Sequence, residues 1–80
     1  MKLTIALFGI TRDIVGRPAL ELTVPAGQSV QQLLAELHQS FPALGQLRSL
    51  AVAVNNEYAQ PETELQERDE IALIPPVSGG

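Results

Sequence analysis

The chain has 80 residues, of which 45% are hydrophobic, and a formal net charge of −4 at pH 7. This length allows one small domain with a modest core. The lack of cysteine excludes disulfides, thiolate zinc sites and a cysteine nucleophile, and the single His38 cannot form a histidine cluster. Because the five Lys and Arg residues are scattered singly, they do not form the basic face of a nucleic-acid-binding module, and we expect no nucleic-acid partner.

An apolar run near the start of the chain extends from Leu3 to Ile10. It is too short for a membrane span or for a signal peptide, and Arg12 and Asp13 interrupt it. We therefore expect a cytoplasmic protein that has no membrane partner.

Alternation of apolar and polar residues predicts strands at residues 2–8 and 19–24, with Leu3, Ile5 and Leu7 facing inward in the first. Residues 10–18 are expected to form the connection between these strands, interrupted at Gly16. The second strand should place three apolar residues on the same inner face, namely Leu20, Leu22 and Val24.

A helix is predicted to begin after Ser29, because Gln32 stands three residues later and completes a capping-box pattern. One face of this helix is apolar with the spacing i, i+3, i+4 and i+7. Pro42 should end the helix, because it disfavours helical geometry at Phe41. The residues of the apolar face are Val30, Leu33, Leu34 and Leu37.

The remaining segments predict a third strand at residues 50–54, a turn at 55–57, an irregular loop at 58–69 with at most one short extended piece, and a last strand at 70–74. One helix laid across one face of a mixed sheet is the economical packing for these elements. We therefore predict an α+β fold of the ubiquitin-like β-grasp type, with four to five strands and with the first and last strands central and parallel. The domain would cover residues 1–74, followed by a tail at 75–80.

The sheet face that turns away from the helix is also apolar, which is unusual for a face in contact with water. Small apolar residues around one or two large ones are typical of a docking surface, and Tyr58 would extend it. The alternative is that the alanines are merely tolerated and that Phe8 folds under a loop. The residues predicted to face outward are Thr4, Ala6, Phe8, Ala51, Ala53, Ala72 and Ile74.

The segment PPVSGG at residues 75–80 follows the last strand directly. Pro75 and Pro76 remove two backbone donors, which ends sheet pairing and extends the chain beyond them. Gly79 and Gly80 have no side chains and can enter a narrow channel. The group delivered there would be the α-carboxylate of Gly80, which reacts once another enzyme has adenylated it with ATP. Sulfur would then give a thiocarboxylate and an amine would give an amide, while the plain alternative is a frayed terminus.

Three segments, FGITRD near the start, VNNE near position 55 and DEIALIPPVSGG at the end, together resemble the MoaD family, the small subunits of molybdopterin synthase. The resemblance implies a carrier without an active site of its own. An E1-like adenylating enzyme would activate the terminal glycine with ATP, and sulfur transfer would give a thiocarboxylate. The tail would then enter the active site of the large subunit and give sulfur to cyclic pyranopterin monophosphate, building the molybdopterin dithiolene. The implied assembly is a heterotetramer, and no metal or cofactor is expected on this chain.

The resemblance also implies roles for individual residues. Gly80 would carry the sulfur, and Gly79 would thread the channel beside it. The family usually has Gly-Asp-Glu before the last strand, where this chain has Arg68, Asp69 and Glu70, so that either a strained Arg68 or another turn type is expected. The residues expected to contact partners are Phe8, Arg12, Tyr58, Ile74, Pro75, Pro76, Val77 and Ser78.

Other candidate sites are weaker. Residues 62–70 hold five of the nine acidic residues, but no histidine and no calcium-loop spacing accompany them, so we expect a solvated loop or, alternatively, a patch for a basic partner. His38 is expected to be an ordinary, partly exposed side chain, and Ser78 lacks a neighbouring base. The five acids are Glu62, Glu64, Glu67, Asp69 and Glu70.

Two other functions are compatible with the Gly-Gly end of the chain, namely a ubiquitin-like modifier and a sulfur carrier for thiamin or cysteine synthesis.

Overall fold

The structure is a computed structural model that describes residues 1–47 and 50–75. Strands and helices alternate in the first half of the chain, and the last three elements are strands. In chain order they are β1 (Lys2–Leu7), α1 (Ile10–Val15), β2 (Ala19–Thr23), α2 (Val30–Ser40), the 3-10 helix η1 (Pro42–Gln46), β3 (Ala51–Val54), β4 (Glu57–Tyr58) and β5 (Ile71–Ile74).

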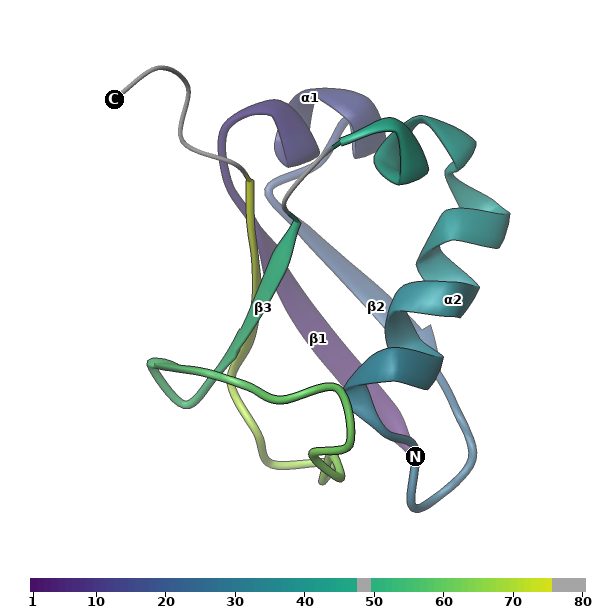
Figure 1. The fold of residues 1–80 in the computed structure, drawn as a ribbon, viewed down its shortest axis with the longest axis vertical. Helices are drawn as coiled ribbons and strands as arrows, with labels where there is room; N and C mark the ends of the chain where they lie inside the picture. The colour runs from purple at the N-terminus through teal and green to yellow at the C-terminus, as the bar shows by residue number, and fades with distance from the viewer. Residues whose placement is uncertain (48–49, 76–80) are drawn as a thin grey trace.

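The described strands form one mixed sheet in the order β2-β1-β5-β3-β4. β1 and β5 are parallel neighbours near its centre, and the other pairs are antiparallel. Helix α2 crosses one face of this sheet, and no helix of the described residues covers the opposite face (Figure 1). The predicted β-grasp arrangement, with its first and last strands central and parallel, is therefore confirmed.

The connection predicted at residues 10–18 is wrong in one respect, because it contains the short helix α1. Gly16 ends this helix in the left-handed conformation, with φ 85°, and its N–H donates to the Arg12 carbonyl at 2.7 Å. Thr11 is the buried residue of α1, so the helix is fixed by packing against the domain. Six residues are too few for a helical periodicity to appear in the sequence.

The predicted capping box of α2 is confirmed. The Ser29 hydroxyl accepts the Gln32 N–H at 3.2 Å, and the Gln32 side chain accepts the Ser29 N–H at 3.0 Å. At the other end Phe41 leaves helical geometry, with φ −131° and ψ 82°, as expected for the residue before Pro42. These two signals place the helix within one residue of its predicted bounds.

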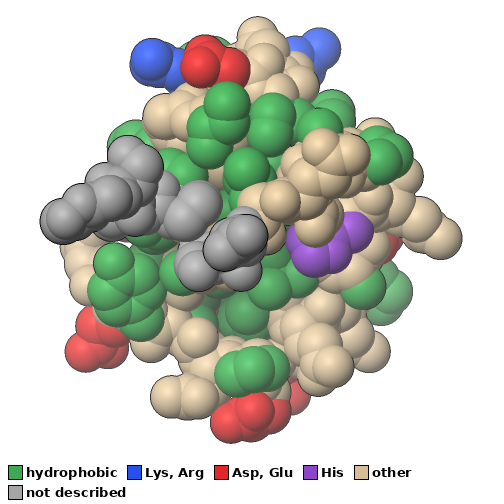
Figure 2. All heavy atoms as spheres, turned by 45° about the horizontal axis from the view of Figure 1, so that its top comes forward, with side chains coloured by type: hydrophobic (Ala, Val, Ile, Leu, Met, Phe, Trp, Pro, Cys, Tyr) green, Lys and Arg blue, Asp and Glu red, His purple; other side chains and the backbone are tan. Residues whose placement is uncertain are grey.

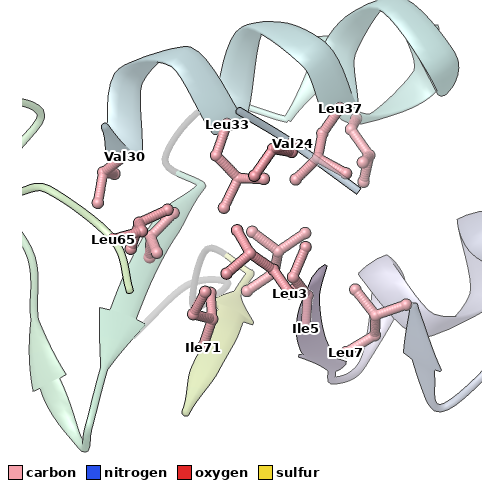
Figure 3. Packing of buried hydrophobic residues seen from close by; sticks show 12 residues of the cluster. Leu3, Ile5, Leu7, Val24, Val30, Leu33, Leu37, Leu65 and Ile71 are labelled. Carbon is pink, nitrogen blue, oxygen red and sulfur yellow. The ribbon is translucent and has the colours of Figure 1, made fainter. Parts of the chain in front are cut away.

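The hydrophobic core lies between α2 and the sheet, where Val30, Leu33 and Leu37 point toward Leu3 and Ile71 (Figure 3). Strand and helix periodicity predicted most of its members, but two were not predicted. Their segments are irregular or 3-10 helical, so neither period applies. The unpredicted residues are Leu44 in η1 and Leu65 in the loop after β4.

The loop after β4 is tied to the start of α2 along its length. The Val30 N–H donates to the Thr63 carbonyl at 2.9 Å, and the Leu65 N–H donates to the Gln28 carbonyl at 2.8 Å. Leu65 itself is 1% exposed. The segment predicted as an irregular loop is therefore irregular in backbone but ordered, and it closes one end of the core.

The turn predicted after the third strand is a two-residue connection between β3 and β4. β4 is the fifth strand of the four to five predicted, and it lies where the predicted turn meets the loop that was expected to hold at most one short extended piece. Asn55 and Asn56 both have positive φ, 54° and 70°, as this type of tight hairpin requires. They are the only non-glycine residues with positive φ within 1–47 and 50–75. Arg68 therefore does not bear that strain, and the alternative of another turn type is confirmed, with the Asp69 N–H donating to the Gln66 carbonyl at 3.0 Å.

The two asparagines of this turn should respond differently to replacement by glycine. Glycine relieves positive φ at either position, but Asn55 also donates to Asp69 at 3.1 Å and accepts the Glu70 N–H at 3.0 Å. We expect Asn55→Gly to lower the free energy of unfolding by about 1 kcal/mol. Asn56→Gly, the matched control, should leave it unchanged or slightly raised. Urea titration of the two variants measures the difference, and equal values would show that the Asn55 side-chain hydrogen bonds do not stabilise the fold.

Candidate functional site

The helix-free face of the sheet carries a hollow of about 320 Å³. Three residues predicted to contact partners, Phe8, Tyr58 and Ile74, lie around it. We call this surface the docking face, and its lining residues are Phe8, Ala53, Asn56, Tyr58, Ala72 and Ile74.

The strand register explains why the surface is hollow. Ala53 on β3 pairs with Ala72 on β5 and with Tyr58 on β4, so two small side chains stand between larger ones. Phe8 is 51% exposed and Tyr58 is 74% exposed. Exposed aromatic rings around a small-residue floor have the shape that accepts an apolar side chain from another protein.

The end of β1 and the end of β5 meet at the same edge of the sheet, because these strands are parallel. Phe8 follows β1 and Pro75 follows β5, and the two segments are close. A Cβ built on Gly9 would lie 3.3 Å from the Pro75 Cγ. The docking face and the start of the predicted tail are therefore neighbours.

Figure 2 looks toward the end of the molecule that carries α1 and η1. Hydrophobic side chains form much of the surface there, and most charged side chains lie toward its margins. Such a distribution suits an interface with an apolar centre and a polar rim.

The remaining predicted site residues are placed as follows. Arg12 is exposed on α1 and does not line the hollow, so its expected partner contact stays a prediction. Gly79 and Gly80, for which the chemical role was predicted, lie outside the described residues. So do three residues predicted to contact partners, namely Pro76, Val77 and Ser78.

Sequence reasoning missed Asn56, Gly9 and Thr11 near this surface. Asn56 lies in the tight turn close to Tyr58 and lines the hollow. The pair Asn55-Asn56 between two strands is typical of a two-residue hairpin turn, and this pattern could have placed Asn56 beside the surface. Gly9 and Thr11 shape the backbone after β1 through contacts that no periodic pattern reveals.

The acidic side chains of the described ranges do not form a second site. No group of three or more His, Asp or Glu side chains there is arranged to hold a metal ion. Asp69 in the acidic loop already bonds to Asn55 and to the Gln66 N–H, so it serves the fold. In the same part of the chain, no helix has the length and apolar character needed to cross a bilayer.

Sequence comparison gives a family and close relatives. A family model described as the ThiS family matches residues 5–80. A protein of Arabidopsis thaliana named molybdopterin synthase sulfur carrier subunit is 42% identical over 81 residues, which cover 100% of this chain and 84% of that protein.

Two solved structures share the fold over the whole chain. SAMP1 from Haloferax volcanii is 27% identical, with a TM-score of 0.83 and coverage of 100% of both chains. A chain in the complex of subunits 1 and 2 of molybdopterin-converting factor from Helicobacter pylori is 25% identical, with a TM-score of 0.68 and 100% coverage of both chains. The first structure is named for SAMP1 only. The second is named as a protein–protein complex of two subunits, one of which is the chain similar to this one.

Proposed function

The chain belongs to the ThiS/MoaD family, and we propose that it is the sulfur-carrier small subunit of a molybdopterin synthase. The observation that carries this proposal is the 42% identity over the full chain to a relative of that name. The range covered by the family model, residues 5–80, also contains Gly79 and Gly80, the residues proposed to carry the chemistry.

In the proposed reaction, an E1-like enzyme transfers AMP from ATP to the Gly80 carboxylate and releases pyrophosphate. A sulfur nucleophile then attacks the acyl carbon, AMP leaves, and a thiocarboxylate remains. In the active site of the large subunit the thiocarboxylate sulfur would bond to a carbon of cyclic pyranopterin monophosphate. Water would then cleave the acyl carbon–sulfur bond and restore the Gly80 carboxylate, and two such transfers would complete the dithiolene. This chain would supply the sulfur-bearing carboxyl terminus and the folded domain that partner enzymes bind, and it would bind neither ATP nor a metal. The proposed location is the cytoplasm.

The docking face is the surface proposed to hold the large subunit. Its position beside Pro75 means that a partner bound there stands next to the start of the tail. The two-subunit complex from Helicobacter pylori supports a partner of this kind, because it contains a chain of the same fold. We propose the same pairing here, with two large subunits joined centrally in a heterotetramer.

A second function is supported by the similarity to SAMP1, since that name stands for small archaeal modifier protein 1. A modifier would use the same Gly80 adenylate but pass the acyl group to a lysine amine. The two functions share every feature of the domain, and only the nucleophile differs.

Intact-protein mass spectrometry distinguishes the two functions. The chain is incubated with its activating enzyme, ATP and a sulfur donor, and we expect a mass gain equal to one exchange of oxygen for sulfur. The product, mixed with the large subunit and cyclic pyranopterin monophosphate, should return to the original mass as molybdopterin appears. Adducts on lysines without the sulfur gain would favour the modifier, and no change of any kind would contradict both.

A further inference from the structure

The four residues from Phe8 to Thr11 form a tight turn directly after β1. The Thr11 N–H donates to the Phe8 carbonyl at 3.1 Å, which closes the turn. Gly9 has φ 55° and ψ −129°, a combination that strongly favours glycine. The turn therefore depends on the residue type at position 9.

The Thr11 side chain fastens the same turn a second time. Its hydroxyl donates to the Phe8 carbonyl at 2.6 Å and accepts the Phe8 N–H at 3.0 Å. Thr11 is 0% exposed, so water does not compete for these bonds. Both backbone polar groups of Phe8 are thus held by one buried side chain, although the Phe8 side chain is half exposed.

Gly9 also adjoins the residue that follows β5. The 3.3 Å separation between a Cβ built at position 9 and the Pro75 Cγ is tighter than an ordinary contact. Any larger residue at position 9 would push against Pro75 as well as strain the turn. One turn therefore contacts both the docking face, through Phe8, and the chain leaving β5, through Gly9.

We propose that Thr11 and Gly9 are positioning residues for docking and sulfur delivery. Thr11 fixes the backbone from which the Phe8 side chain extends, and Gly9 leaves the space in which Pro75 lies. Together they fix the position of Phe8 on the docking face relative to Pro75 at the start of the tail. A partner bound to the docking face is therefore placed next to the tail. This inference rests on the proposed function, since it assigns these residues a part in that same interface.

The test of Thr11 compares Thr11→Val, which removes the hydroxyl at nearly constant volume, with Thr11→Ser, which keeps it. We expect Thr11→Val to expose the Phe8 amide to hydrogen exchange and to weaken binding to the large subunit roughly fivefold. Thr11→Ser should restore binding to within about twofold of the unmodified chain. Exchange is followed by NMR and binding by calorimetry.

Thr63→Val is the matched control. The Thr63 hydroxyl accepts the Gln60 N–H at 3.1 Å in a similar turn of the loop after β4. This variant should expose the Gln60 amide to exchange while leaving the Kd for the large subunit unchanged. Equal weakening by Thr63→Val and Thr11→Val, or exposure of the Phe8 amide with unchanged binding, would overturn the proposal.

The Gly9 part of the proposal has an independent test. We expect Gly9→Ala to lower kcat for sulfur transfer at saturating large subunit by at least about tenfold, because Pro75 is displaced. Gly27→Ala is the control, since Gly27 also has positive φ, 85°, but nothing lies within 4 Å of its Cβ. An unchanged kcat for Gly9→Ala would overturn this part even if Thr11→Val failed to fold. If the unmodified chain neither gains sulfur nor binds the large subunit, the proposed function fails instead.

Discussion

Deleting Gly80 is expected to abolish sulfur transfer while leaving the domain folded. The deletion shortens the proposed tail by one residue, so that its carboxylate no longer reaches the two active sites where it must react. Catalytic groups lose activity steeply when they are misplaced by a fraction of a residue length. The assay is the sulfur-dependent mass gain followed by molybdopterin formation, and full activity would contradict the tail mechanism.

Gly79→Trp and Gly79→Ala extend this test to the channel. A channel that admits only glycine should stop the tryptophan variant entirely and slow the alanine variant, whereas a wide channel would tolerate both. All buried hydrophobic residues of the described part lie between Leu3 and Leu73, so none of these tail changes removes a described core contact. We therefore expect the free energy of unfolding to change by no more than about 0.5 kcal/mol.

Those elements that bury a regular stripe of side chains could be predicted from the sequence. β1 alternates because one face of it packs under α2, and α2 shows a period of 3.6 residues because it packs on the sheet with one side only. The capping box is visible for a similar reason, since both of its bonds are made within four consecutive residues.

The rest could not be predicted because tertiary contacts determine it. α1 is too short to show the helical period of 3.6 residues in its sequence. Its buried residue, Thr11, is a polar residue of the kind expected in an exposed loop. Leu65 is fixed by backbone bonds to the start of α2, which lies more than thirty residues earlier in the chain. β4 is two residues long and forms through its pairing with β3, so the bounds of this fifth strand could not be read from the sequence.

The candidate site divides in the same way. Phe8 and Ile74 could be placed on the outer face by alternation, because a residue of known parity in a strand has a known side. Tyr58 was added from its position just after the Asn-Asn turn, and the family resemblance pointed to the same residue. The turn made by Gly9 and Thr11 escaped both approaches, since its function depends on a hydroxyl bonding three residues back and on a close approach to Pro75.

Phe8→Glu should leave the isolated domain folded and should remove its binding to the large subunit. The Phe8 side chain is half exposed in the free domain, so a carboxylate there remains hydrated and costs little stability. In the complex the same carboxylate would be buried in an apolar hollow without a partner. Such a burial costs several kcal/mol, which corresponds to a Kd at least about a hundredfold higher.

Ile10→Glu is the matched control for this change. Ile10 is 45% exposed, lies two residues away and does not line the hollow, and its replacement gives the same net charge. A general repulsion between an acidic chain and its partner would weaken binding equally in both variants and would weaken it less at high salt. Selective loss in Phe8→Glu that persists at high salt assigns the effect to desolvation on the docking face. Equal, salt-sensitive losses would instead show that the partner recognises the charge of this end of the domain and not its hollow.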